Sequence, residues 1–595
     1  MFRSRLPTSR PASPSATTVA GSLERRVGGI LVVLAVLGYF LGASYGINGP
    51  FYYGHYGYHG GSYATWARGT LRHHTLYPVN EPGFATPDPR TYYIHHPMLT
   101  HQLVTLTFAL LGQHEWSVRV AAMIPSFASL LLVTGIAWRY LGPLAGGAAG
   151  LVFSFVPVNI WYEAHIDQGF PSIACLLAFF WFYLGWLRAP RWRLGLAALF
   201  FQMMAGNFEW STYFAFPAIF VHVAWTAFRR RGRYLTFALL HPLTVVLPLG
   251  FHFWMVHRAN LVPDIIAAYH NRAAMVRYPF FATAMANYAE VLFGPALELV
   301  MIGWLLVVVV NFAKGCRWGW RWRWRWRRPP VRTVELVGFT FAFTLIVYMH
   351  VFKSAVMTHA YRQLYGNVWA ALAAAALVGA GQRWGRRLFR RRPRGMVPAG
   401  LGAGLGILVL ISVLTLPTSW AGLLESRLHG GVPLWKTFNP DLRQTAFAAR
   451  LEALTRPGDV LYFHTSFAWP PPHRMDWAFY YDRDQHRSAT LRGLGFLTPA
   501  ERSHALVILY PNTLGGDELR QFATLASHHP VWEVEDLAVL DLRTEGSRLE
   551  AFRIIAPTRA PSFSLPAWLE GPYPHPVLEA DPKRAARLAA LVKRR

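Results

Sequence analysis

Apolar runs recur along this chain between residues 27 and 416, each close to the roughly 20 residues that a helix needs to cross a bilayer. Only 15% of the 595 residues are charged, against roughly 25% in an ordinary soluble protein. These features predict a polytopic α-helical membrane protein and exclude a soluble single domain and a disordered chain. Eleven spans are predicted, at about 27–46, 119–139, 143–160, 170–187, 193–208, 212–227, 235–255, 290–312, 334–352, 366–381 and 397–416.

Basic clusters separate alternate pairs of these runs and so orient them. They are Arg188/Arg191/Arg193, Arg229–Arg233, Lys314–Arg332 and Arg383–Arg394. Because cytoplasmic loops carry the excess of Lys and Arg, we expect an inner (cytoplasmic) membrane protein with a cytoplasmic N-terminus and an extracytoplasmic C-terminus. Counting the short apolar segment 98–112 as a span would break this pattern, so it is predicted to lie at the outer interface or to be re-entrant.

Three parts follow along the chain. Residues 1–26 are predicted to be a disordered basic cytoplasmic tail, and 27–423 a transmembrane domain with a long first outer loop at 47–118. After about Leu424 the composition changes, and 19 of the 30 carboxylates lie there. Short apolar strands at 459–464, 505–510 and 537–541 alternate with the helical stretches 442–455 and 517–527. This pattern predicts an extracytoplasmic α/β domain over 424–595.

The net charge of +28 would fit a nucleic-acid partner if the basic residues formed one face, but they are divided among the loops. Trp and Arg alternate in the tract 317–328, which we interpret as a loop at the headgroup level that contacts membrane lipids. No nucleic-acid partner is expected. The two cysteines, Cys175 and Cys316, exclude a disulfide framework and a cysteine-based metal site.

Carboxylates are costly in a membrane, and those of the membrane part gather at the predicted outer ends, so chemistry is expected to point outward. The second outer loop holds Glu163, His165 and Asp167 within a few residues. Asp167 directly precedes a span and is interpreted either as a cap of that helix or as an oriented base.

Histidines mark the first outer loop, at His55, His59, His95 and His96. A Gly-, His- and Tyr-rich loop packs poorly by itself and is expected to line a site. A divalent metal is the less favoured alternative, because the spacings match no standard zinc pattern. No cofactor is assigned.

Two later outer loops add cations. One contains Arg272, and the other contains His359, Tyr361 and Arg362. These groups are expected either to hold the phosphate of an anionic lipid or to anchor the chain to phospholipid headgroups.

Several motifs carry a family resemblance over about residues 27–190. Tyr92-Tyr-Ile-His-His-Pro-Met-Leu through Glu115-Trp-Ser-Val-Arg119 resembles the pattern YYxxHPPL…FGxxEWxxR, and Tyr63-Ala-Thr-Trp-Ala-Arg68 resembles YSxxARN. Tyr162-Glu-Ala-His-Ile-Asp167 resembles YGRMVDHEP. These patterns are similar to those of membrane glycosyltransferases of the GT-C superfamily, in the bacterial branch of the protein O-mannosyltransferase type, related to the lipid A aminoarabinose transferase.

The resemblance implies a glycosyltransferase that moves a sugar from a polyprenyl-phosphate donor to a cell-envelope acceptor, either a glycan, a lipid or a protein. A carboxylate would deprotonate the acceptor, and basic groups would stabilise the phosphate that leaves. Asp167, Glu163 and His55 are the expected catalytic residues. The expected substrate-binding residues are His59, Arg68, His95, His96, Arg119, His165, Arg272, His359, Tyr361 and Arg362.

The chain departs from the family at two places. No carboxylate lies between Asn48 and Arg68, and Gln168-Gly169 replaces a His-Glu pair. Four alternatives stay open: a polar role for His55, Asp167 as the main acid/base, a contribution from Glu81 or Asp88, or a catalytically inactive scaffold. A transporter or flippase of lipid-linked saccharides is the rival function.

Overall fold

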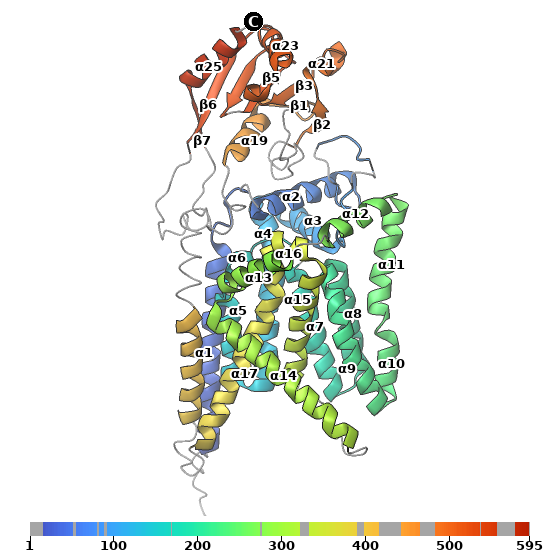
Figure 1. The fold of residues 1–595 in the computed structure, drawn as a ribbon, viewed down its shortest axis with the longest axis vertical. Coiled ribbons are helices and arrows are strands. Elements are labelled where there is room, and N and C mark those ends of the chain that lie inside the picture. The colour runs from blue at the N-terminus through green and yellow to red at the C-terminus, as the bar shows by residue number, and fades with distance from the viewer. Residues whose placement is uncertain are drawn as a thin grey trace, which may run out of the picture.

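The computed structural model forms a bundle of long helices with a smaller sheet domain at one end (Figure 1). It describes residues 16–51, 55–79, 83–88, 92–167, 169–273, 277–321, 333–388, 398–415, 442–464, 482–535, 537–555 and 577–593. The expected domain boundary near residue 424, and the Trp/Arg tract from residue 322 on, lie outside these residues.

The bundle confirms the helical membrane fold. Within the described residues, nine helical segments are long and apolar enough to cross a membrane, and they coincide with nine of the eleven predicted spans. The protein is therefore a multi-pass membrane protein. The bundle helices are α1 (Ala16–Ser44), α4 (Glu115–Leu141), α5 (Pro143–Phe155), α6 (Pro157–Tyr162), α7 (Gly169–Arg188), α8 (Trp192–Phe208), η2 (Trp210–Phe214), α9 (Ala215–Arg230), α10 (Arg233–Leu240), α11 (Leu243–Arg258), α14 (Pro295–Arg321), α15 (Thr333–Val351), α17 (Leu364–Leu388) and 398–415.

The other two predicted spans are shorter helices. The run 143–160 is divided at Val156, which is extended at φ −68° and ψ 136°. The residue before a proline avoids the helical region, so Pro157 ends α5 after 13 residues and starts α6 in a new direction. The run 193–208 is α8, with 17 residues, and it ends at the extended residue Glu209. Both interruptions bring polar groups to the same end of the bundle.

The structure corrects one prediction, which concerns residues 16–26. We expected them to be disordered, but they form the first turns of α1. Glu24 in this stretch pairs with Arg386 of α17, which gives these turns a partner. Residues 1–15 lie outside the described part of the chain.

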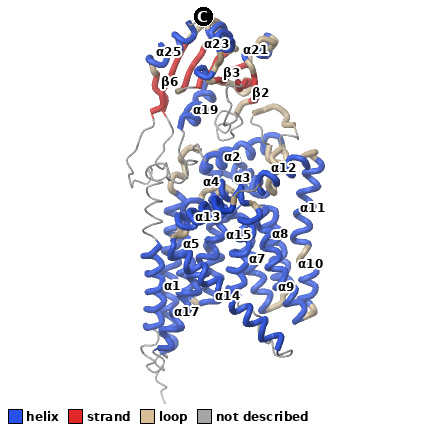
Figure 2. The backbone as a smooth tube through the Cα atoms, viewed as in Figure 1, coloured by secondary structure: helices blue, strands red, loops and turns tan. Residues whose placement is uncertain are grey.

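Short helices cover the end of the bundle that faces the sheet domain (Figure 2). The expected interfacial helix is α3 (Leu99–Leu111), which is 13 residues long and packs against α2 and α4. The junction of α9 with α10 and the C-terminal end of α14, which carry basic clusters, lie at the opposite end (Figure 1). The other covering elements are α2 (His55–His73), α12 (Val262–Ala273), α13 (Tyr278–Leu292), α16 (Lys353–Thr358) and η3 (Ala360–Gln363).

The C-terminal part is built on a mixed seven-stranded sheet in the order β2-β1-β3-β5-β4-β6-β7. The expected strands and helices are present, which confirms the α/β character of this part. Its elements are α19 (Leu442–Leu454), β1 (Val460–His464), β2 (Asp484–Ala489), α21 (Leu491–Leu494), α22 (Pro499–Arg502), β3 (Ala505–Leu509), α23 (Gly516–Ala526), β4 (Val531–Val534), β5 (Leu537–Asp541), β6 (Leu549–Ile555), β7 (Val577–Ala580) and α25 (Pro582–Lys593).

Both faces of this sheet are covered. Leu506 and Ile508 of β3 pack with Phe447 of α19 on one face. Val507 of the same strand packs with Phe522 of α23 on the other. Because strand side chains alternate between faces, a strand covered on both sides is apolar throughout, as the five buried residues of β3 are.

An ion-pair cluster joins the sheet domain to α2. Arg72 donates from Nη1 and Nη2 to the two carboxylate oxygens of Asp482, at 3.1 and 2.5 Å. Arg68, one turn earlier on α2, places Nη1 at 3.5 Å from Asp482 Oδ2. The three side chains are only 13–21% exposed, so water screens this cluster less than an open surface pair.

Removing the carboxylate tests this junction. We expect Asp482→Asn to weaken docking by about 1 kcal/mol, because neutral amide contacts replace charge-assisted ones. Amide hydrogen exchange in α2 and α19 should become about fivefold faster, as expected for local opening. Asp517→Asn, at an exposed ion pair with Arg520, is the matched control and should leave these rates unchanged. Equal rates for both variants would show that the pair does not hold the domain.

Candidate functional site beneath the sheet domain

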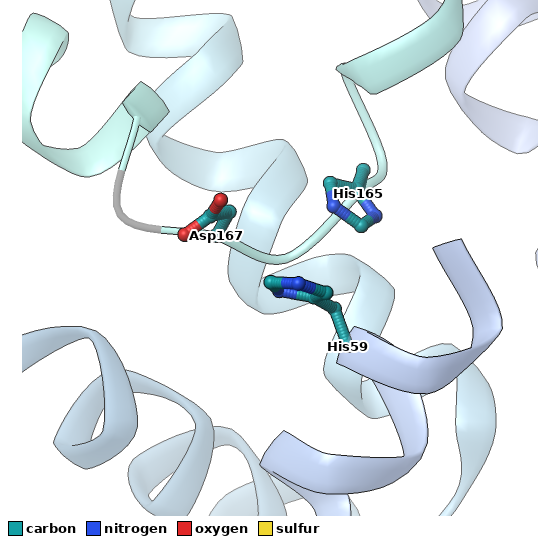
Figure 3. Close-up of side chains that lie close together, drawn as sticks. All are labelled: His59, His165 and Asp167. Atoms are coloured by element: carbon teal, nitrogen blue, oxygen red, sulfur yellow. The ribbon is translucent and has the colours of Figure 1, made fainter. Parts of the chain in front are cut away.

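Three side chains from two distant segments converge beneath the covering helices. His59 comes from α2, whereas His165 and Asp167 come from the loop between α6 and α7 (Figure 3). Their nearest ligand-type atoms all lie within 4.8 Å of one another. We refer to His59, His165 and Asp167 as the His–His–Asp cluster.

The short loop after α6 is held in place from both sides. Ser126 of α4 donates to the Glu163 backbone carbonyl at 2.9 Å. Ile166 is buried in an apolar cluster formed by α2, α3 and α4. Burial of Ile166 in this cluster anchors the loop between His165 and Asp167.

The imidazoles of the cluster are held neutral. Burial lowers the pKa of His165 to about 3. Burial, together with the nearby His165, His359 and Arg362, lowers the pKa of His59 well below its usual value. The His59 ring centroid lies 5.3 Å from that of His165 and 6.3 Å from that of His359. At neutral pH these rings therefore offer lone pairs beside a carboxylate, which suits proton handling or binding of a cation.

A buried ion pair borders the cluster. Arg362 of η3 donates from Nη1 to Glu209 Oε2 at 2.7 Å, and the two side chains are 7% and 0% exposed. Burial raises the pKa of Glu209, Arg362 lowers it, and the charge of Asp167 raises it further. Asp167 and this ion pair thus belong to one electrostatic unit.

Glu209 is not among the site residues expected from the sequence. The available signal was a carboxylate at the predicted outer end of an apolar helix, where a charge is costly. Its partner, 153 residues later in the chain, could not be identified from the sequence.

A second basic group faces the same region. Arg272 of α12 places Nη2 at 3.0 Å from His96 Nε2 and donates from Nη1 to the His95 carbonyl at 3.2 Å. Trp210 Nε1 also donates to the His95 carbonyl, at 2.8 Å. Burial, followed by Arg272 and Arg362, lowers the pKa of His96 well below its usual value. The expected residues His95, His96, Arg272 and Arg362 are thus brought together.

Glu163 takes a different place from the one expected. It accepts a hydrogen bond from Asn159 Nδ2 at 2.9 Å and packs against Gly42 of α1, where an added Cβ would clash with Glu163 Oε1. The carboxylate ends α6 and points into the bundle, outside the His–His–Asp cluster. Its structural environment favours a role in joining α1 to α6.

Two arginines expected to bind substrate are engaged in structural contacts. Arg119 donates to the backbone carbonyls of Ile47, Gly49 and Pro50 at 2.6, 2.5 and 3.2 Å, and so fixes the chain between α1 and α2. Arg68 donates from Nε to Gln113 Oε1 at 2.7 Å and lies beside Asp482, as described above. The sequence motifs predicted an arginine at each of these two positions but not the group that the arginine contacts.

Other expected residues are placed only in part. His55 is the first residue of α2 and Tyr361 lies in η3, but their side chains are outside the described part of the structure. Glu81 falls there as well.

The His–His–Asp cluster fits a divalent cation by donor type, with two neutral imidazoles and one carboxylate. Ligand atoms around a tetrahedral zinc ion lie about 3.4 Å apart when the Zn–N distance is about 2.0–2.1 Å. A separation of up to 4.8 Å therefore requires these side chains to move closer together before they could hold such an ion.

Acid should destabilise this end of the bundle. His101 of α3 stacks on Tyr63 with ring centroids 4.6 Å apart, and burial lowers its pKa to about 3. In the unfolded chain the His pKa is about 6.5, so below that pH only the unfolded state gains the proton and stability falls. We expect His101→Phe to reduce the slope of the unfolding free energy against pH by up to about 1.4 kcal/mol per pH unit between pH 6.5 and 4.5. Unfolding measured against pH tests this; profiles parallel to those of the exposed control His114→Phe would contradict it.

The buried ion pair should behave as a unit. Arg362→Gln leaves the Glu209 carboxylate buried without its cation, which we expect to cost about 3–5 kcal/mol of unfolding free energy. The double variant Glu209→Gln/Arg362→Gln removes the stranded charge and should recover most of that loss. Unfolding of the two variants in the same detergent is the measurement. A double variant as unstable as Arg362→Gln would argue against a buried pair.

The match to a family model agrees with the motifs. Residues 95–252 match the family model described as dolichyl-phosphate-mannose-protein mannosyltransferase. The chain is also similar to ArnT from Cupriavidus metallidurans, solved without ligand and bound to undecaprenyl phosphate, with 14% identity over 86% of this chain and 97% of that one, at a TM-score of 0.49. The oligosaccharyltransferase of Archaeoglobus fulgidus is similar at 12% identity over 88% of this chain and 74% of that one, also at a TM-score of 0.49. No match is found among curated protein sequences. The family resemblance expected from the motifs is thus confirmed by the family model for residues 95–252.

Proposed function

We propose that this protein is an integral membrane glycosyltransferase that moves a sugar from a polyprenyl-phosphate donor to a cell-envelope acceptor. The observation that carries the proposal is the His–His–Asp cluster lying beside a buried basic group at one end of the bundle. The family match over residues 95–252 includes His165 and Asp167 and supports the same reaction class.

Asp167 is the proposed base or acceptor-orienting group. Its side chain is buried, and a ligand-type atom of His59 and of His165 lies within 4.8 Å. A base must lie within hydrogen-bonding reach of the proton that it takes, and a carboxylate can accept that proton from a sugar or protein hydroxyl. The neutral imidazoles orient the acceptor without competing for the proton.

Arg362 and Arg272 are proposed to bind the lipid phosphate. The departing phosphate carries negative charge, and preorganised cations in a site shielded from water stabilise such charge strongly. Glu209 fixes the direction of Arg362, and the His95 carbonyl fixes that of Arg272. His359 lies beside His59 on the same side as Arg362 and would help to close the site.

We further propose that this end of the bundle faces away from the cytoplasm. Basic clusters at the opposite end fit the cytoplasmic face of a membrane, and the sheet domain then lies outside the cell membrane. A lipid donor would enter laterally, and the acceptor would approach from the side of the sheet domain.

Sugar transfer by the purified protein tests the proposal. We expect transfer or slow hydrolysis of polyprenyl-phosphate monosaccharides, and Asp167→Asn should lower the rate by about 10²–10⁴-fold, as loss of a general base does. Glu579→Gln, at an exposed pair with Arg553 on the sheet domain, serves as the charge-matched control and should retain wild-type turnover.

Two results would contradict this assignment. Equal turnover of Asp167→Asn and the control would move the base elsewhere, with His55 the next residue to replace. Absence of turnover across donors and acceptors, with movement of lipid-linked saccharide between the leaflets of vesicles, would instead favour a flippase.

A further inference from the structure

The sheet domain contains a cavity that is separate from the His–His–Asp cluster. It has a volume of about 430 Å³ and lies between α21, α23 and the ends of α22 and β5. This volume is within the range of small-molecule sites, roughly 300–1,000 Å³. It can hold one or two sugar units.

The lining of this cavity is strongly basic. Arg492, Arg502, Arg520 and His529 all contribute, and no Asp or Glu is among the lining residues. Concave surfaces lined by charges of one sign concentrate ligands of the opposite sign. The charge therefore favours an anionic ligand.

Local contacts leave the basic groups suited to a ligand. Arg502 donates from Nη2 to the Gly495 carbonyl at 2.9 Å, which holds its guanidinium at the cavity. Arg520 pairs with Asp517, but these side chains are 68% and 84% exposed, so the pair is weak and can be exchanged for a ligand. His529 Nδ1 lies 2.8 Å from the Thr544 carbonyl, which fixes the ring.

Apolar groups accompany the charges. Leu494, Leu525 and Leu542 line the cavity, and Phe496 follows the lining residue Gly495 in sequence. Phe496 is 82% exposed, the largest exposure among the large apolar residues of the described structure. An exposed ring one residue after a residue that lines a basic cavity is suited to stacking against the apolar face of a sugar.

The position of the cavity limits its role. In Figure 1, α21 and α23 lie at the end of the molecule away from the membrane helices, whereas the His–His–Asp cluster lies beneath the sheet domain. A ligand in this cavity therefore cannot present its reacting hydroxyl to Asp167. The cavity can only hold a unit far along a long chain.

We propose that this cavity binds a carboxylate- or phosphate-bearing saccharide unit of a long acceptor glycan. The inference rests on the proposed function, because that function makes a cell-envelope glycan the acceptor. Arg492, Arg502 and Arg520 would bind the anionic group, and Phe496 would stack on the sugar ring. The sheet domain then selects anionic glycans and keeps them close to the site between transfers.

Equilibrium binding to the full-length protein in detergent tests the proposal. The probes are a glucuronate-containing tetrasaccharide, a phosphorylated monosaccharide, an uncharged tetrasaccharide and inorganic phosphate. We expect a charged saccharide to bind at least tenfold more tightly than the uncharged one. Arg492→Gln/Arg520→Gln should lose this preference, and Arg548→Gln, at an exposed pair with Glu550, should keep it.

Further binding measurements distinguish a saccharide ligand from free phosphate, and distinguish failure of this site from failure of the proposed function. Phe496→Ala should weaken binding of the charged saccharide but not of inorganic phosphate. Equal affinities of the wild type for the charged saccharide and for inorganic phosphate would overturn the saccharide assignment. Equal binding to wild type and Arg492→Gln/Arg520→Gln would overturn the site. All binding is repeated in Asp167→Asn, where it should be unchanged. Selective binding without any transfer by the wild type would refute only the glycosyltransferase function, whereas transfer without selective binding would refute only this site.

Discussion

The ion pair between Glu209 and Arg362 organises the end of the bundle that lies beneath the sheet domain. Both side chains are almost completely buried, so neither charge is tolerable without the other. Glu209 lies where α8 stops and η2 begins, and Arg362 lies in η3 just before α17. Their bond therefore joins two interruptions of the bundle that are distant in sequence. Burial is the main cause that lowers the pKa of His59 and of His96, and Arg362 lowers both further, so its charge acts on both sides of the candidate site.

Helix α2 connects the site to the sheet domain. His59 lies in its first half and Arg72 near its end, about 20 Å apart at 1.5 Å per residue. Its first half contributes to the His–His–Asp cluster, and its second half binds Asp482. Movement of the sheet domain would thus act on the helix that carries His59. This arrangement provides a physical route by which an acceptor held by the sheet domain would affect the geometry at Asp167.

Periodic and compositional features made much of the fold predictable. Apolar runs located the membrane helices, charge asymmetry kept α3 from being counted as a span, and alternating elements indicated the α/β domain. Breaks within the helices were harder to predict, because the run 143–160 contains no charged residue and only Pro157 marks where its helix ends. Candidate-site residues were predictable by type, and His59, His165 and Asp167 do converge. Partners were not predictable: Arg68 and Arg119 bind groups that lie far away in sequence, and nothing local shows that Asp482 or the Ile47 carbonyl will be there.

The proposed mechanism depends most on where a lipid phosphate binds. A cryo-EM structure of the protein with a non-hydrolysable polyprenyl-phosphonate sugar would test this directly. We predict the phosphonate between Arg362 and Arg272, next to His96, with the anomeric carbon of the sugar facing Asp167. A phosphonate bound elsewhere on the bundle, with the sugar away from the His–His–Asp cluster, would contradict the proposed site and the mechanism built on it.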